Sequence, residues 1–299
     1  MKSLSLPNAH NITSLAIGKF DGMHLAHRAL LGRLDSQGAL LCIETSESCT
    51  LTPKHTKERY TKYPIFYLPL SAIKNLSGAE FARFIIQHFT NLKKLVVGYD
   101  FRFGKDRAFG ASDLEFLLPQ LEIVVVEEFC VNEIGVHSSL IKEFIATGNF
   151  KMANALLGRA YSILGASVQG QNLGSKELFA TINIQCNGYF LPENGVYATL
   201  SKITCDDMQD SKTHTLLAPF ADRYLKSVSF IGNRLSTDRA FSIETHILDT
   251  FIPTLPPILE ISFIQKLRDN RHFQNRHELK NQIAIDIAQA KNLLEKREL

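Results

Sequence analysis

Two histidines, His24 and His27, stand three positions apart in the segment GKFDGMHLAH. An apolar run that ends at Gly18 precedes them, and a helical pattern begins at about Leu25. The N-terminal end of a helix presents unpaired N–H groups and the positive end of the helix dipole, so it suits a phosphate group. Each imidazole can add a donor to a phosphate oxygen. Donors placed in this way stabilise charge that develops on phosphates during nucleotidyl transfer, without a nucleophilic side chain.

The turn between the apolar run and the helix carries a glycine and an acid. Gly22 permits the backbone to turn closely, and Asp21 can hydrogen-bond the turn or balance the charge of a histidine. The H-x-x-H spacing alone also fits a pair of surface histidines that simply begins a helix. A metal site is a weaker interpretation, since no third ligand follows at a recognisable spacing.

The elements that must position this turn are short apolar runs that alternate with helical patterns over residues 12–126. This alternation is typical of β-α units on a parallel sheet. One crossover helix is predicted over SGAEFARFIIQHF, where Ser77 and Glu80 can form a capping box and the apolar residues share one face. The strands are predicted at 14–18, 39–44, 65–70, 94–98 and 122–127.

The pattern changes after Glu127. Residues 138–158 predict a Ser-capped helix, a Gly148-Asn149 turn and a second helix that ends at Gly158, where we place the domain boundary. Residues 161–266 alternate over short runs, which predicts an antiparallel barrel or sandwich. The apolar stripe over 279–294 predicts a helix that closes this barrel, with a partner-binding helix as the alternative.

Composition excludes several classes of protein. A formal charge of +3 over 299 residues is too mild to indicate nucleic-acid binding. No run reaches the roughly 18 apolar residues of a membrane span, and no signal-peptide core is present. The cysteines form no C-x-x-C pair, so we expect reduced, mostly buried thiols in a cytoplasmic protein; they are Cys42, Cys49, Cys130, Cys186 and Cys205. We also expect no obligate protein partner, because no feature of the sequence indicates one.

GKFDGMHLAH resembles the G-x-F-D-G-x-H-x-G-H signature of the bacterial bifunctional riboflavin kinase/FMN adenylyltransferase (FAD synthetase) family. Other segments resemble the family in the same order along the chain. Residues 96–110 resemble G-x-D-F-x-F-G-x-x-R, and residues 136–165 resemble the S-S-T-x-I-R segment with its helix pair. Residues 170–183 stand where the family has a Gly-rich stretch ending in P-T-A-N. Residues 242–249 resemble another family segment, in which Glu244 occupies the position of the family's catalytic glutamate.

The resemblance implies an α/β plus all-β fold: a nucleotidyltransferase-type, Rossmann-like domain over residues 1–158 and a riboflavin kinase barrel with a C-terminal helix over 159–299. It implies phosphorylation of riboflavin to FMN by ATP, then adenylylation of FMN by ATP to FAD and pyrophosphate, with Mg²⁺. The implied catalytic residues are His24, His27 and Glu244. The implied ATP- and phosphate-binding residues are Gly18, Phe20, Asp21, Gly22, Ser138, Ser139, Lys142, Gly174, Thr181 and Asn183, of which Thr181 and Asn183 also bind the metal. The implied flavin-binding residues are Asp100, Phe101, Phe103, Gly104 and Arg107.

The residues themselves admit simpler interpretations. Isolated phenylalanines are more often core, a serine before a helix is usually a cap, and a strand glutamate is usually exposed.

Several positions also depart from the family pattern. Ala26 replaces the glycine between the histidines, Lys142 replaces an arginine, and Ser175, Leu178 and Ala180 alter the Gly-rich segment. Two alternatives therefore stay open: an FMN adenylyltransferase with a degenerate kinase domain, or a non-catalytic flavin- or nucleotide-binding regulator.

Overall fold

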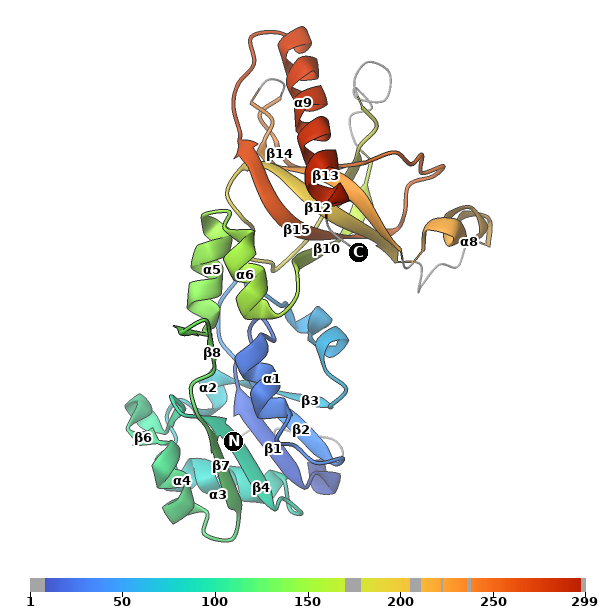
Figure 1. Ribbon diagram of the computed structural model, residues 1–299. Helices are drawn as coiled ribbons and strands as arrows, with labels where there is room; N and C mark the ends of the chain where they lie inside the picture. The colour runs from blue at the N-terminus through green and yellow to red at the C-terminus, as the bar shows by residue number, and fades with distance from the viewer. Residues whose placement is uncertain (1–8, 170–178, 205–210, 222, 236–237, 297–299) are drawn as a thin grey trace. The chain divides into compact units, whose positions relative to one another are not determined.

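The computed structural model describes residues 9–169, 179–204, 211–221, 223–235 and 238–296. The chain divides into two compact units, Met1–Ser138 and Ser139–Leu299. The sequence places the domain boundary twenty residues later, after Gly158; that boundary stays a prediction. Figure 1 shows the two units along the chain.

The first unit contains the predicted parallel sheet, with strand order β3-β2-β1-β4-β7. From the central strand the chain adds β2 and β3 on one side, then returns to add β4 and β7 on the other. The carboxyl ends of β1 and β4 therefore form the switch point at which open α/β sheets bind ligands. The strands are β1 (Ser14–Gly18), β2 (Gly38–Glu44), β3 (Ile65–Pro69), β4 (Lys94–Gly98) and β7 (Glu122–Val126).

Helices cover both faces of this sheet (Figure 1). On one face, α1 (Leu25–Leu31) buries Leu30 and Leu31 against alternate strand residues. The other face is covered by α2 (Leu70–Ile73), α3 (Gly78–His88) and α4 (Ala111–Leu117). The predicted capping box is confirmed: the Glu80 N–H donates to Ser77 Oγ at 3.3 Å, and the Ser77 N–H donates to Glu80 Oε2 at 2.8 Å. Smaller elements are η1 (Ala9–Asn11), η2 (Lys54–Tyr60), η3 (Lys105–Arg107), β5 (Arg102–Phe103), β6 (Phe109–Gly110), β8 (Cys130–Val131) and β9 (Ile134–Gly135).

The second unit begins with the predicted helix pair. The first helix, α5 (Ser138–Ala146), starts at the last residue of the first unit, and α6 (Phe150–Leu157) follows it. Asn149 caps α6, and Gly158 ends it in the left-handed region that favours glycine. The Phe150 ring stacks on Phe263 at a centroid distance of 5.1 Å, so α6 packs on the barrel that follows.

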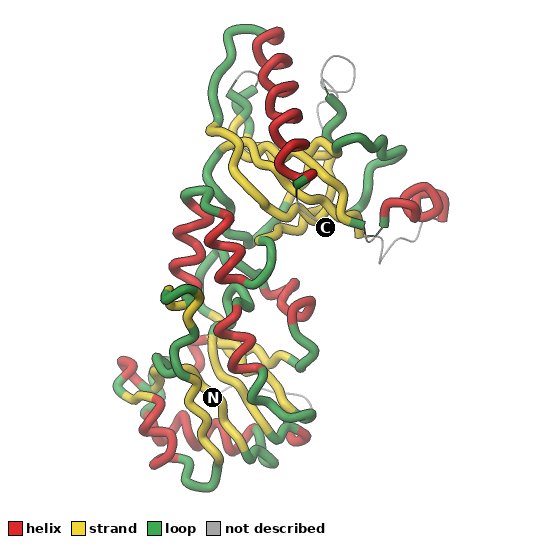
Figure 2. The backbone as a smooth tube through the Cα atoms, in the orientation of Figure 1, coloured by secondary structure: helices red, strands yellow, loops and turns green. Residues whose placement is uncertain are grey.

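The strands form a closed antiparallel barrel with the order β10-β11-β14-β13-β12-β15. Of the two predicted architectures, barrel and sandwich, the barrel is therefore confirmed. Helix α9 (Arg276–Glu295) lies along its outside (Figure 2), where Ala290 and Leu294 are buried against β12 and β13. The predicted closing helix is thus confirmed. The strands are β10 (Tyr161–Val168), β11 (Ile182–Gln185), β12 (Gly195–Thr204), β13 (Tyr224–Asn233), β14 (Phe241–Ile247) and β15 (Ile258–Asp269), and between β12 and β13 lie α8 (Ser211–Leu217) and η4 (Ala218–Phe220).

The barrel interior contains a chain of hydroxyl groups. Thr199 lies 2.8 Å from both Ser227 and Ser229, Ser201 lies 2.8 Å from Ser227, and Ser229 lies 2.8 Å from Thr245. All of these side chains are fully buried. Each hydroxyl is satisfied by a neighbour, as burial requires.

The described cysteines are free, but the expectation that most of them are buried is wrong. Cys42 is buried, Cys186 is half-buried, and Cys49 and Cys130 are exposed, because the latter two lie in loops or at the edge of a short hairpin. Burial raises the pKa of the Cys42 thiol to about 11. Among the described residues, no helix has the length and apolar character needed to cross a membrane.

Candidate active sites

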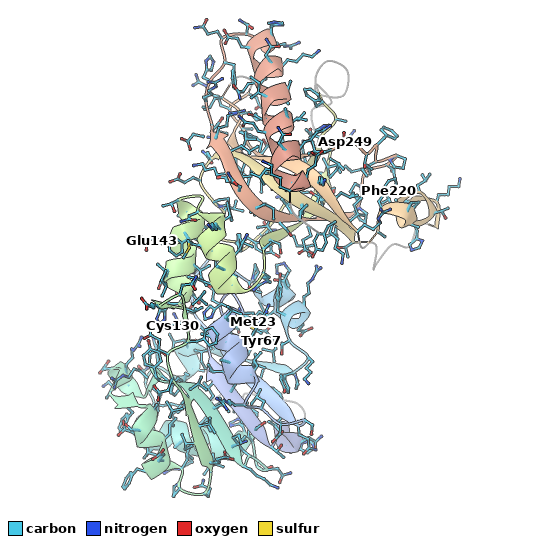
Figure 3. All side chains as sticks on the ribbon, in the orientation of Figure 1. Met23, Tyr67, Cys130, Glu143, Phe220 and Asp249 are labelled. Atoms are coloured by element: carbon cyan, nitrogen blue, oxygen red, sulfur yellow. The ribbon has the colours of Figure 1, made fainter. Side chains whose placement is uncertain are left out.

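The turn after β1 is held in an unusual backbone conformation. Phe20 and Met23 have φ values of +50° and +43°, and Gly22 has a φ of +88°; Met23 is labelled in Figure 3. Glycine adopts such a φ freely, but the two non-glycine residues cost roughly 1–3 kcal/mol each and persist where the surrounding structure enforces them. Here Asp21 does so, since its Oδ1 accepts the N–H groups of Leu51 and Thr52 at 2.7 and 3.2 Å. The turn after β1 is thereby tied to the segment after β2.

The two predicted histidines are stacked, with ring centroids 3.6 Å apart and an interplanar angle of 16°. His24 caps α1: its Nδ1 accepts the backbone N–H of His27 at 3.4 Å. The neutral ring therefore carries its proton on Nε2, which lies 3.2 Å from Ser138 Oγ. The Ser138 hydroxyl donates in turn to the Asp21 carbonyl at 2.8 Å. Three of the predicted phosphate-site residues thus form one hydrogen-bonded chain.

Ser138 follows β7, a parallel strand that ends at the same edge of the sheet as β1, and the β8–β9 hairpin lies between β7 and Ser138 in the chain. It is the first residue of α5, and its hydroxyl serves the turn after β1. Ser139 and Lys142 follow in the second unit, where the Lys142 ammonium lies 5.9 Å from the centroid of the Phe190 ring. Their proposed contact with phosphate stays a prediction.

Lys57 helps to hold the segment that binds Asp21, and the sequence interpretation missed it. Its side chain lies in η2 and is buried, with 6% of the residue exposed, and Nζ donates to the Thr52 carbonyl at 2.8 Å. Thr52 also donates its N–H to Asp21. Thr52, in the segment after β2, is therefore held through its N–H by Asp21 and through its carbonyl by Lys57. A lysine in the polar stretch PKHTKERYTKY gives no signal of burial.

An apolar pocket opens at the carboxyl ends of β1 and β2. The predicted flavin residues Phe101, Phe103 and Gly104 line it, and the two phenyl rings are stacked at a centroid distance of 5.7 Å. Asp100 and Arg107 are exposed and do not line it. The sequence interpretation missed the other lining residues. Five of them have the apolar character of ordinary core residues, namely Ile17, Ile43, Leu70, Ile73 and Phe81, and the sixth is Lys74.

On the barrel, β11 and β14 bring the predicted kinase residues together. Asn183 and Glu244 are register partners, so their side chains lie side by side on the outer face. Their neighbours Ile182 and Thr245 face inward and are buried. Asn183 Oδ1 is buried and has no hydrogen-bond partner among the residues that the structure describes. Thr181 is exposed just before β11, whereas Gly174 lies outside the described residues.

Further polar side chains that the sequence interpretation missed surround Glu244. Its Oε1 accepts from Ser242 Oγ at 2.9 Å and from Arg234 Nη1 at 3.4 Å. The ring Nδ1 of His246 donates to the Ala180 carbonyl at 2.8 Å, next to Thr181. Because Ser242, Glu244 and His246 alternate along one strand, their shared face could have been found from the period of two.

Comparison with known proteins agrees with this arrangement. A family model described as FAD synthetase matches residues 44–140, and one described as riboflavin kinase matches residues 157–294. The fold, the two sites and these matches define a two-domain flavin nucleotide enzyme.

The relatives join both domains as well. The chain is 28% identical to the bifunctional riboflavin kinase/FMN adenylyltransferase of Buchnera aphidicola subsp. Acyrthosiphon pisum, over 93% of this chain and 94% of the relative. It is 27% identical to the Escherichia coli K12 protein of the same description, over 91% and 90%. The chain belongs to the bifunctional riboflavin kinase/FMN adenylyltransferase family.

The fold is also shared with a crystal structure from Streptococcus pneumoniae that is described as a macrolide-efflux protein. The TM-score is 0.79 at 21% identity, over 97% of this chain and 96% of that one. At this identity the likeness concerns the fold alone.

Proposed function

We propose that this chain phosphorylates riboflavin to FMN in its barrel and adenylylates FMN to FAD in its parallel-sheet domain. One observation carries the proposal: each of the two units brings its own candidate site residues together, His24 with His27 in the parallel-sheet unit and Asn183 with Glu244 in the barrel. Riboflavin, FMN and ATP are then its partners, and neither nucleic acid, a membrane nor an obligate protein partner has a role. The use of ATP and the free thiols fit a cytoplasmic enzyme.

Adenylyl transfer requires a phosphate oxygen of FMN to attack the α-phosphorus of ATP while pyrophosphate leaves. The apolar pocket with Phe101 and Phe103 offers a surface for the flavin ring. The N-terminus of α1 and the imidazoles of His24 and His27 stabilise the charge on the phosphates. Ser138 holds the His24 ring and would release it as phosphate arrives.

Riboflavin phosphorylation requires a base for the ribityl 5′-hydroxyl and a site for ATP. Glu244 takes the proton as the hydroxyl oxygen attacks the γ-phosphorus and ADP leaves. Asn183 and Thr181 supply neutral oxygens of the kind Mg²⁺ prefers, and the unpartnered Asn183 Oδ1 fits a metal or a donor on the nucleotide. Bound Mg²⁺ would neutralise charge on the ATP phosphates. His246 fixes the backbone beside Thr181.

A product assay tests the proposal. Purified protein is incubated with riboflavin and Mg-ATP, and flavins are separated over time; FMN should appear first and FAD later. If FAD forms only when FMN is supplied, the kinase domain is degenerate. If flavin binds but neither FMN nor pyrophosphate forms, the protein is a binding regulator.

Replacement of Gly104 by Ala should weaken FMN binding. Gly104 has a φ of +76°, and an added Cβ would lie 2.7 Å from Phe109 Cδ2, so the pocket wall must shift. A non-glycine residue in this conformation costs about 1 kcal/mol or more. We expect KM for FMN to rise about tenfold, with KM for ATP unchanged. Gly32→Ala is the matched control, since its Cβ would meet only ordinary contacts at 3.5 Å; equal KM values in both variants would contradict the flavin role of the pocket.

Replacement of Ala26 by Gly should keep or raise the rate of adenylyl transfer, because it restores space between the histidines. Ala26 lies inside α1, so the change should also lower stability by roughly 0.5–1 kcal/mol. Ala29→Gly costs the same helix a similar amount and separates the two effects. Initial rates and melting temperatures are measured for both; a collapse of the rate in Ala26→Gly alone would contradict the close approach of the nucleotide.

A further inference from the structure

The connection between β13 and β14 carries a bonded pair of charges. Arg234 follows β13 directly, and its Nε and Nη2 donate to the two carboxylate oxygens of Asp238 at 2.9 and 2.7 Å. The backbone closes around the same residue: the Arg234 N–H donates to the Ala240 carbonyl at 3.0 Å, and the Ala240 N–H donates to Asp238 Oδ1 at 3.1 Å. The guanidinium is therefore held in one orientation.

That orientation directs the remaining nitrogen toward Glu244. With Nε and Nη2 on Asp238, Nη1 lies 3.4 Å from Glu244 Oε1. Ser242, two positions earlier on the same face of β14, donates to the same oxygen at 2.9 Å. Two donors thus converge on Oε1, and Oε2 takes part in neither bond.

We infer that Arg234, locked by Asp238, is a positioning residue that turns Glu244 so that Oε2 meets the hydroxyl group to be phosphorylated. The inference rests on the proposed role of Glu244 as base. A carboxylate on a flexible side chain samples many orientations, and a misplacement of about 1 Å can cost on the order of 100-fold in rate. An arginine suits the task because its planar fork can bind one carboxylate with two donors and still offer a third.

Steady-state kinetics of riboflavin phosphorylation test the inference with Arg234→Met, Arg234→Lys and Asp238→Asn. Arg234→Met should lower kcat by about 10- to 100-fold, with KM for riboflavin and for ATP changed by less than about threefold. Arg234→Lys should recover part of this loss because it retains the charge, and Asp238→Asn should fall between wild type and Arg234→Met. Combining Arg234→Met with Asp238→Asn should cost no more than Arg234→Met alone, since both act through one contact. Arg239→Met, at an exposed arginine of the same connection, should leave kcat unchanged.

Melting temperatures distinguish a role of Arg234 in positioning Glu244 from a purely structural role in holding the connection between β13 and β14 together. A loss of kcat at wild-type melting temperature supports the inference. An unchanged kcat in Arg234→Met, or a loss shared by kcat and melting temperature that Arg234→Lys does not relieve, overturns it. If wild type forms no FMN, the proposed function fails and this inference with it. If Glu244→Gln retains full kcat, riboflavin phosphorylation stands but the base role of Glu244 fails, and this inference fails with that role. If Glu244→Gln is inactive and Arg234→Met is not, only the inference fails.

Discussion

Glu244→Gln should abolish the formation of FMN from riboflavin while the conversion of supplied FMN to FAD continues. Glutamine keeps the size of the side chain and can still accept from Ser242, but its amide cannot take the proton of the attacking hydroxyl. The loss of a general base typically lowers a rate by about 10²- to 10⁴-fold. Chromatographic separation of riboflavin, FMN and FAD measures both reactions in one preparation.

A matched substitution serves as the control for Glu244→Gln. Glu295→Gln changes an exposed glutamate near the end of α9 and should leave both reactions intact. Unchanged riboflavin phosphorylation in Glu244→Gln would remove the proposed base. Equal losses of both reactions would instead indicate that the substitution disturbs the whole protein.

His27→Ala should have the reverse effect, with FAD formation lost and FMN formation kept. The backbone N–H of His27 that binds His24 Nδ1 survives the substitution, so the cap of α1 remains. What disappears is the imidazole stacked on His24 and its donor to the phosphates. The loss of one such donor lowers kcat by roughly 10²- to 10³-fold. Pyrophosphate release with supplied FMN measures the effect.

The control for His27→Ala is His10→Ala, an exposed histidine of the same unit. It should form FAD at the rate of wild type. If His27→Ala lowered FMN formation as strongly as FAD formation, the two reactions would not use independent sites.

The parallel sheet could be predicted well because its inner strands, β1, β2 and β4, are buried on both faces. β1 and β4 have the bounds expected from the runs at 14–18 and 94–98, each of which ends at a glycine. The barrel strands are less well defined by the sequence: FATINI alternates from residue 179 to 184, but β11 begins only at Ile182. The alternation of apolar and polar residues indicates that a strand is present. It does not show at which residue the pairing of β11 with β14 begins, because that depends on the neighbouring strand.

The candidate sites could be predicted only as far as their motifs reach. His24, His27 and Ser138 were expected to act together, and the structure places them in contact. Lys57 and Arg234 were not expected, because their roles depend on neighbours that only the fold supplies. An ordinary polar stretch or a hairpin charge gives no period or spacing from which such a contact can be inferred.

The hydroxyl chain inside the barrel has a consequence for the outer surface. Apolar packing is non-directional, so it tolerates small sliding of one strand along another. Hydrogen bonds at 2.8 Å are directional and short, and the bond of Thr245 to Ser229 sets the axial position of β14 against β13. Glu244 directly precedes Thr245 on β14, so its side chain points to the opposite face of the strand. The interior hydroxyls therefore fix the position of the Glu244 carboxylate along the barrel axis relative to β13.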